Sequence, residues 1–349
     1  MSLSRILFLA DSHLGFDTPV HPRIKRRRRG EDFFANYRRA LDAARLEEID
    51  LVIHGGDMFS HTKVPPRVIM DAFEPLIELA DDGVPVFIVP GNHERSKIPQ
   101  TLFTMHKNLH VFSEPLTYDL SIDDIRISLS GFPYTRNIRD SFPRIVSSLA
   151  QGISSTSDVR ILCMHHVVEG AVVGVFDYTF KNGEEVIRGS DLTGDFDVIL
   201  SGHIHRYQIL TDDLDGQPLG SHVYYPGSIE RTTYAERNEV KGYLILEIKK
   251  ESTSKRPVLS HQFIPLPTRP MVSFDITGSS LTVKNMAGRI SGLFENLDPD
   301  SVVRIAIRGE IDTKAAQILT NEYLRSLAPD TMNVTLIIPG RQPHSDGTL

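Results

Sequence analysis

Length, composition and charge set the first limits on this chain. It has 349 residues, 40% of them hydrophobic and 24% charged, and a formal net charge of −7. The length favours two domains or one domain with an appendage, and the composition is ordinary for a soluble globular protein. Since no apolar run approaches the ~20 residues that cross a bilayer, we expect no membrane-spanning helix.

The cysteine content and the N-terminal sequence bear on location. The single cysteine, Cys163, cannot form a disulfide within the chain, which fits the reducing cytosol. The sequence from Met1 to Arg5 leads directly into a strand-like run, without the apolar segment and cleavage site of a secretory signal. We therefore expect a cytoplasmic protein.

The first hundred residues alternate apolar runs with helical patterns. We expect strands at residues 5–10, 51–53 and 86–89, a helix at residues 33–44, and a second helix that opens at Pro65-Pro66 and continues to residue 80. Near-continuous apolar strands in a β-α-β-α-β order predict parallel strands covered by helices on both faces. In such sheets, ligands bind beyond the carboxyl ends of the strands.

After about residue 109 the expected strands become shorter. They lie at residues 125–129, 161–164, 198–200, 223–225 and 243–248, with a helix at 140–149. We expect a first domain at 1–250, and the prolines and polar residues of 251–270 make this stretch the best linker candidate. A small α+β domain at 271–340 should follow, with strands at 272–276, 302–307 and 334–338 and helices at 283–297 and 313–327. The tail, 341–349, should be disordered.

Five polar clusters follow the apolar runs and form the candidate site. They are Asp11-Ser12-His13, Gly56-Asp57, Gly91-Asn92-His93-Glu94, His165-His166 and Gly202-His203-Ile204-His205. A lone histidine is more often a surface residue than a ligand, and a lone Gly-Asp is a turn. Because every cluster ends a predicted strand, together they predict one site for two metal ions. Mixed imidazole, carboxylate and amide ligands suit manganese, iron or zinc better than magnesium or calcium.

This arrangement resembles the calcineurin-like metallophosphoesterases over residues 5 to about 230. The resemblance implies a four-layered α/β/β/α sandwich and two divalent ions that clamp both oxygens of an in-line displacement. It assigns Asp11, His13 and His205 to the first metal, Asn92, His165 and His203 to the second, and Asp57 as a bridge between them. It also implies that His93 contacts the phosphate and helps to protonate the leaving oxygen, which suits an imidazole near neutral pH.

More of the sequence is similar to the SbcD-type nucleases of DNA double-strand-break repair. The similar stretches are Leu9-Ala10-Asp11-Ser12-His13-Leu14-Gly15, Gly55-Gly56-Asp57-Met58-Phe59, Gly91-Asn92-His93-Glu94, Ser201-Gly202-His203-Ile204-His205 and Tyr225-Pro226-Gly227-Ser228. The unit that opens Thr268-Arg269-Pro270-Met271 is similar to that group's capping domain, which helps to position DNA.

The second resemblance implies an activity and partners. The activity is a Mn²⁺-dependent 3′-to-5′ exonuclease on duplex ends and an endonuclease on single-stranded DNA. The implied partners are an SbcC-type ABC ATPase with long coiled coils and a second copy of the chain. Two alternatives stay open: a phosphatase or phosphodiesterase of a small substrate on the same site, and a non-catalytic scaffold for DNA ends.

Two stretches are candidates for contact with the substrate. The group often carries a histidine three residues after the bridging aspartate, but here that position is Ser60 and the histidine is His61. The basic run from Arg23 to Arg29 is either a solvated loop or a loop that holds a phosphate backbone. Its place shortly after the first cluster favours the second interpretation, with Arg26, Arg27 and Arg28 as the contacts.

Overall fold

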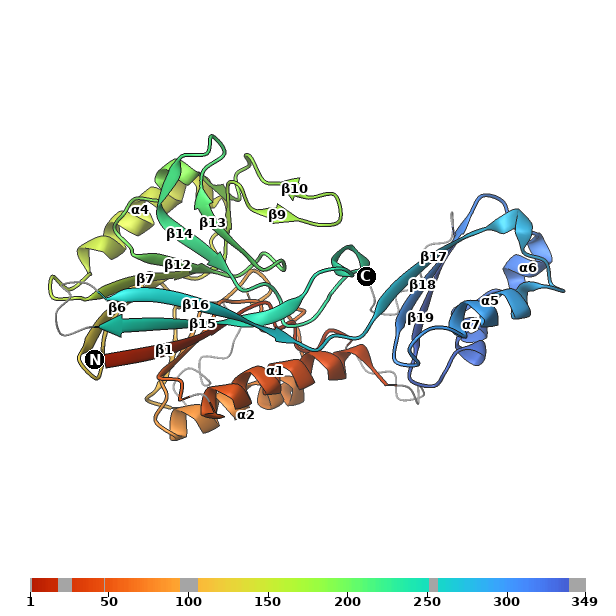
Figure 1. Cartoon of the computed structure of the whole chain (residues 1–349), viewed down its shortest axis with the longest axis horizontal. Coiled ribbons are helices and arrows are strands. Elements are labelled where there is room, and N and C mark those ends of the chain that lie inside the picture. Colours follow the sequence, from red (N-terminus) through yellow and green to blue (C-terminus); the bar gives the residue numbers. More distant parts are fainter. Residues whose placement is uncertain (1, 18–26, 47, 95–105, 251–256, 339–349) are drawn as a thin grey trace. The chain divides into compact units, whose positions relative to one another are not determined.

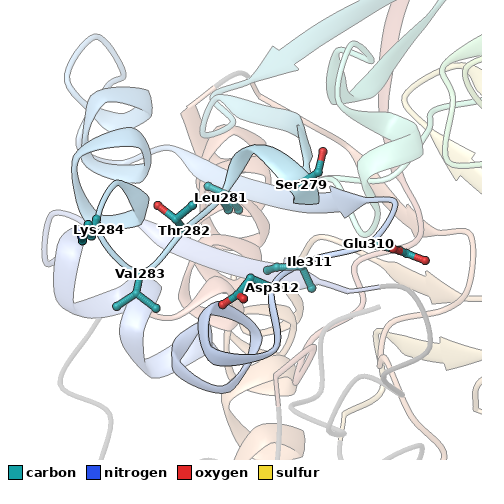
Figure 2. Close-up of a pocket in the computed structure, with 8 residues that line it drawn as sticks. All are labelled: Ser279, Leu281, Thr282, Val283, Lys284, Glu310, Ile311 and Asp312. Atoms are coloured by element: carbon teal, nitrogen blue, oxygen red, sulfur yellow. The ribbon is translucent and has the colours of Figure 1, made fainter.

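The computed structural model describes residues 2–17, 27–46, 48–94, 106–250 and 257–338. The chain forms two compact units (Figure 1). The first unit comprises Met1–Phe16, Phe33–Arg231 and Glu239–Pro267, and the second comprises Asp17–Asp32, Thr232–Asn238 and Thr268–Leu349. Both units contain strands and helices, so the mixed α/β class predicted from the sequence is confirmed. Among the described residues, no helix combines the length and the apolar character needed to cross a membrane.

The first unit contains two six-stranded sheets, and the first of these holds the three expected N-terminal strands. Its strand order is β16-β15-β1-β2-β3-β4. The four strands from β1 to β4 run parallel, and β15 and β16 extend the sheet in antiparallel fashion. The bounds are β1 Ser2–Leu9, β2 Leu51–His54, β3 Val86–Ile88, β4 Leu109–Val111, β15 Lys241–Lys250 and β16 Val258–Leu266.

The second sheet has a similar plan, with a parallel centre and antiparallel edges. Its order is β13-β14-β12-β7-β6-β5, in which only the edge strands β13 and β5 are antiparallel to their neighbours. The bounds are β5 Leu116–Ile122, β6 Ile125–Gly131, β7 Val159–Met164, β12 Val198–Ser201, β13 Gln208–Asp212 and β14 Pro218–Tyr225. Two short pairs lie beside it: β8 (Val167–Val168) with β11 (Val186–Ile187), and β9 (Val172–Val173) with β10 (Tyr178–Thr179).

Three hydrophobic cores hold these layers together. Helices α1 (Arg29–Leu46) and α2 (Pro66–Asp81) share a core with the first sheet, and α4 (Ile138–Gln151) shares one with the second sheet. The third core joins the two sheets, with residues such as Phe8 from one and Ile161 from the other. Since each sheet is covered on both faces, its central strands are apolar throughout, which is why they appear as continuous apolar runs in the sequence.

One segment of the first unit differs from the expectation. Val258–Leu266, part of the linker expected at 251–270, instead forms β16, which pairs with β15 from Lys241↔Leu266 to Lys249↔Val258. This is an edge strand, and most of its side chains are exposed or half-buried. Residues 251–256 and the tail expected at 341–349 lie outside the described residues.

The second unit is built on a parallel three-stranded sheet, β17-β18-β19. Its strands are β17 Met271–Thr277, β18 Val302–Arg308 and β19 Asn333–Ile337, and its helices are α5 Met286–Phe294, α6 Thr313–Ile318 and α7 Asn321–Leu327. The single helix expected at 313–327 is two helices, because Asp312 caps the first and Thr320 caps the second. Val303, Ile305 and Ile307 alternate along β18 into the core that these helices cover.

The second unit also includes residues that precede the first helix of the chain. The buried Arg269 donates to Asp32 Oδ2 at 3.0 Å, to Asn333 Oδ1 at 2.6 Å and to the Thr331 carbonyl oxygen at 2.7 Å. Arg27 pairs with Asp32 at 2.7 Å and with Asp300 at 2.9 Å. The first turn of α1 thus belongs to the second unit, although Asp32 and Arg269 are 237 positions apart in the chain.

Candidate metal centre

The candidate ligands lie where the sequence pattern expects them, beyond the carboxyl ends of parallel strands. Asp11 and His13 follow β1, Asp57 follows β2, and Asn92 and His93 follow β3, whereas His165 follows β7 and His203 and His205 follow β12. Each sheet therefore contributes ligands. Backbone hydrogen bonds join the loops: the Asp11 N–H donates to the Gly56 carbonyl oxygen at 2.9 Å and the His13 N–H to the Asp57 carbonyl oxygen at 3.0 Å.

Asp11, His13 and His205 form one group whose ligand atoms all lie within 4.8 Å of one another. The Nε2 atoms of His13 and His205 are 3.0 Å apart, and His205 Nε2 is 3.7 Å from Asp11 Oδ1. Asp11 is fully buried, and its carboxylate accepts the His203 backbone N–H at 3.0 Å. This bond orients the carboxylate and ties the loop after β1 to the loop after β12.

Asp57, His165 and His203 form a second group of the same kind, which Asn92 completes. Asn92 Oδ1 lies 2.9 Å from His203 Nδ1 and 3.2 Å from His165 Nε2, and the two ring nitrogens are 3.2 Å apart. Asp57 Oδ2 is 3.4 Å from His165 Nε2. Asp57 also belongs to a group with His13 and His93, so its carboxylate lies between the two sets of ligands.

The partners of His165 show that this cluster fits metal cations. Its Nδ1 lies 2.7 Å from the Gly55 carbonyl oxygen, which accepts a hydrogen bond only from an N–H. In the neutral ring, Nε2 then turns a lone pair toward Asn92 Oδ1, itself an acceptor. Lone pairs that converge in this way repel unless a proton or a metal ion lies among them, and imidazole, carboxylate and amide oxygen are ligands for divalent ions.

The backbone at the cluster is strained. Asp11, His13, Asp57 and His203 have φ angles of 52°, 43°, 49° and 80°, in the left-handed region that residues other than glycine seldom adopt. Each costs about 1–3 kcal/mol, and such strain persists at functional sites because the surrounding structure enforces it. Gly56, Gly91 and Gly202 let the loops approach, because a Cβ atom at each would collide with His165, Asp57 or the Gly55 carbonyl oxygen.

A family model described as calcineurin-like phosphoesterase matches residues 4–207, more than half of the chain. This chain is a calcineurin-like phosphoesterase. Membership places it among the metal-dependent phosphodiester hydrolases, and the family and the cluster together support divalent metal ions as its cofactors.

Individual proteins resemble this phosphoesterase more distantly. It is 26% identical over 335 residues to the DNA double-strand break repair protein Mre11 of Methanosarcina acetivorans, covering 92% of this chain and 48% of that protein. It is 23% identical over 347 residues to the protein of the same name from Sulfurisphaera tokodaii, covering 94% and 80%. The phosphoesterase thus spans about half the length of the first of these relatives. A crystal structure of a dimetal phosphatase from Danio rerio superposes with a TM-score of 0.45 and 12% identity, over 73% of this chain and 98% of that one.

Glu94 supports the phosphoesterase site in a way that the sequence analysis did not foresee. Its buried carboxylate accepts three backbone N–H groups, from Gly91 at 2.7 Å, Phe59 at 2.9 Å and Asp57 at 3.0 Å. It therefore clamps the loop after β2 to the loop after β3. Burial, with a further contribution from the Asp57 carboxylate, raises the pKa of Glu94 to about 7.

Two further histidines are buried beside the ligands. His54 Nε2 lies 2.8 Å from Ser12 Oγ, and burial lowers the pKa of His54 to about 3, so its ring is neutral. His166 stacks between Phe132 and Tyr134, and its Nε2 accepts the Thr135 N–H at 3.2 Å. Its ring is thereby held in the wall of the site.

Burial and the neighbouring charges shift the pKa values of the candidate ligands. Burial opposes a charge on His165, but the Asp57 carboxylate, Asp11 and the Gly55 carbonyl oxygen together outweigh it and raise the pKa of His165 to about 9. Burial raises the pKa of Asp11 to about 6, and burial together with His165 lowers the pKa of His203 to about 3. Since ligands bind metals in their deprotonated forms, metal binding displaces protons from this site.

The expected substrate contacts are less defined. His61 is exposed on the loop after β2, next to Ser60. Arg27 is engaged in its pairs with Asp32 and Asp300, and Arg28 pairs with Asp17 at 3.0 Å. Arg26 lies outside the described residues. The role of these four residues in binding a phosphate backbone stays a prediction.

Proposed function

We propose that this phosphoesterase is a two-metal DNA nuclease of double-strand-break repair. In this proposal it digests duplex ends as a 3′-to-5′ exonuclease and cuts single-stranded DNA as an endonuclease, with Mn²⁺ as its metal. The observation that carries the proposal is the convergence of seven ligand side chains from five strand ends on one cluster. Support for DNA as the substrate comes from relatives named as DNA double-strand break repair proteins.

The proposed ligands fall into two sets, one for each metal ion. Asp11, His13 and His205 would hold one ion, Asn92, His165 and His203 the other, and Asp57 would bridge them. When bound, the ions supply a nucleophile at neutral pH and stabilise the charge that develops on the phosphate. The Gly55 carbonyl oxygen binds His165 Nδ1, which leaves Nε2 as the atom that would bind the second ion.

His93 is the proposed general acid. Its Nδ1 lies 2.5 Å from the Ser60 carbonyl oxygen, so the ring donates its Nδ1–H there. Its Nε2 is then free to carry a proton, 3.7 Å from Asp57 Oδ2, and about a third of the side chain is exposed to an incoming substrate. A ring oriented in this way can deliver a proton to a leaving oxygen.

The proposal also includes two protein partners and a role for the second unit. An SbcC-type coiled-coil ABC ATPase and a second copy of the chain would assemble with it in the cytoplasm, and the second unit would act as a cap that positions DNA. The similarity to the Mre11 proteins over both units supports the cap, because the aligned stretch covers 92% of this chain.

The test uses purified protein stripped with chelator and then supplied with Mn²⁺ or Mg²⁺. End-labelled duplex and single-stranded DNA are the substrates, with a nitrophenyl phosphodiester in parallel. We expect Mn²⁺-dependent shortening of the DNA, with polarity given by the label that is lost. Turnover of the small ester with intact DNA would contradict the nuclease proposal and favour a small substrate on the same site.

A further inference from the structure

The β9–β10 hairpin of the first unit ends in an apolar tip that faces solvent. Phe176 is 97% exposed, and Val175 and Tyr178 beside it are 41% and 61% exposed. Figure 1 shows this hairpin projecting beyond the body of the second sheet. Exposure of a whole phenylalanine ring is costly, because burying such a side chain contributes about 1.5–3 kcal/mol. A ring held in water therefore suggests a ligand that covers it.

The hairpin that carries the tip is hydrogen-bonded at its base. Its turn has left-handed backbone at Gly174 and Asp177, with φ angles of 73° and 52°. At the base, the Gln208 side chain accepts the Val172 N–H and donates to the Val172 carbonyl oxygen, both at 2.8 Å. The Gln208 side chain therefore fastens the base of the hairpin to β13.

The tip is also coupled to the candidate metal centre. Arg206 directly follows the candidate ligand His205, and its guanidinium donates to the Gly174 carbonyl oxygen and to Asp177 Oδ1, each at 2.6 Å. It also pairs with Glu239 at 3.2 Å. A single arginine side chain thus joins the ligand loop to the turn that carries Phe176, and it neutralises the carboxylate of Asp177 beside the ring.

The size of the tip limits what it binds. An aromatic side chain buries about 150–250 Å², so the three exposed side chains offer far less than the ~800 Å² per partner of a stable protein interface. A single exposed ring, on a turn that Arg206 joins to the loop of the candidate ligand His205, matches the area of one nucleobase. Base–aromatic stacking is tolerant of sequence, as an enzyme that digests DNA ends requires.

From this geometry we propose that Phe176 is a stacking platform for an unpaired nucleobase of the DNA substrate. The inference rests on the proposed nuclease function and assigns a residue that positions the strand. Stacking at Phe176 would hold a frayed base while the backbone of its strand enters the metal centre.

The first test measures cutting. In Phe176→Ala we expect the KM for single-stranded DNA to rise between about 5-fold and 150-fold, the scale of one lost base–aromatic stack, with kcat changed far less. Phe176→Tyr should restore the KM. Hydrolysis of the nitrophenyl diester should be unchanged in both variants, because that substrate has no nucleobase.

The second test observes stacking directly. The chain has no tryptophan, so Phe176→Trp introduces a unique fluorophore. Oligodeoxynucleotides with phosphorothioate linkages, which slow cutting, should quench its emission. Val258→Trp is the matched control, because Val258 is 58% exposed. Val258 pairs with Lys249, which pairs with Leu3 at the amino end of β1. The candidate ligands lie beyond the opposite, carboxyl end of that strand.

The outcomes separate the two proposals. If the parent protein does not cut DNA, the proposed function fails first. If the parent cuts DNA but Phe176→Ala has the same KM and DNA leaves the tryptophan of Phe176→Trp unquenched, the stacking inference alone is overturned. Loss of self-association in Phe176→Ala, without a change in KM, would likewise overturn it and assign the tip to contact between copies of the chain.

Discussion

His93 Nε2 lies 3.7 Å from Asp57 Oδ2, yet substitutions of the two residues should have different effects. In His93→Leu we expect both metals to bind while nuclease activity falls at least about a hundredfold, the usual scale for a lost general acid. In Asp57→Ala we expect the metal content itself to fall, because the carboxylate lies between the two ligand groups. Elemental analysis and DNA digestion of the same samples measure both effects.

His222→Leu is the control for these substitutions, since His222 is an exposed histidine on β14. It should leave metal content and cutting unchanged. Full activity in His93→Leu would remove this histidine from the mechanism, and full metal content in Asp57→Ala would show that Asp57 does not bridge.

At this scale the sequence was most informative about side chains that follow apolar runs. The clusters that contain Asp11, Asn92 and His203 could be predicted to share a metal site because each ends a recognisable strand, and the family resemblance assigned the individual ligands. The role of Glu94 could not be predicted, because two of its three hydrogen bonds come from residues 35 and 37 positions away. The exposure of Phe176 likewise depends on a hairpin of two-residue strands, too short to leave a periodic pattern.

Between elements, one ion pair joins the two sheets and gives stability a pH dependence. Asp158, just before β7, accepts the Arg126 N–H of β6 at 2.9 Å and lies 2.8 Å from Lys250 Nζ of β15. Burial alone would raise the pKa of Asp158, but the bonds from Lys250 and Arg126 lower it from 3.8 to about 2. A carboxylate whose pKa falls on folding stabilises the native state above its unfolded pKa.

The prediction concerns Asp158→Asn. At pH 7 the parent should be more stable by about 1 kcal/mol, a modest value because the pair is partly solvated. This difference should shrink as the pH falls from about 4 toward 2, where the parent loses the charge as well. Urea unfolding of both proteins between pH 7 and pH 3 measures it, with the exposed Asp42→Asn as control. A difference that does not change with pH would show that the charge of Asp158 is not its cause.

The bounds of a strand could be predicted where it is buried in a core, but not where it lies at the edge of a sheet. The strands at 51–53 and 86–89 were found because both of their faces are apolar. The sequence favours a linker over β16 because polar residues precede this segment and Pro265 lies within it, as is possible only at an edge strand. The split between α6 and α7 depends on Thr320, whose Oγ1 accepts the Tyr323 N–H at 3.1 Å, a cap that periodicity alone does not reveal.

At the scale of the whole molecule, the division into units is discontinuous. Residues 17–32 and 232–238 belong to the second unit although they are enclosed in sequence by the first. The sequence could not indicate this, because the decisive contacts, such as Arg269 with Asp32, span 237 positions. The chain therefore passes repeatedly between the unit with the metal centre and the unit proposed as a cap.

The central claim is that seven side chains from the two sheets of the first unit hold two metal ions. Crystals of the protein soaked with Mn²⁺ and measured at the manganese absorption edge test it most directly. We predict two anomalous peaks ~3.5–4 Å apart, as in two-metal sites, one contacting Asp11, His13 and His205 and the other Asn92, His165 and His203, with Asp57 touching both. A single peak, or two peaks that Asp57 does not join, would contradict the account.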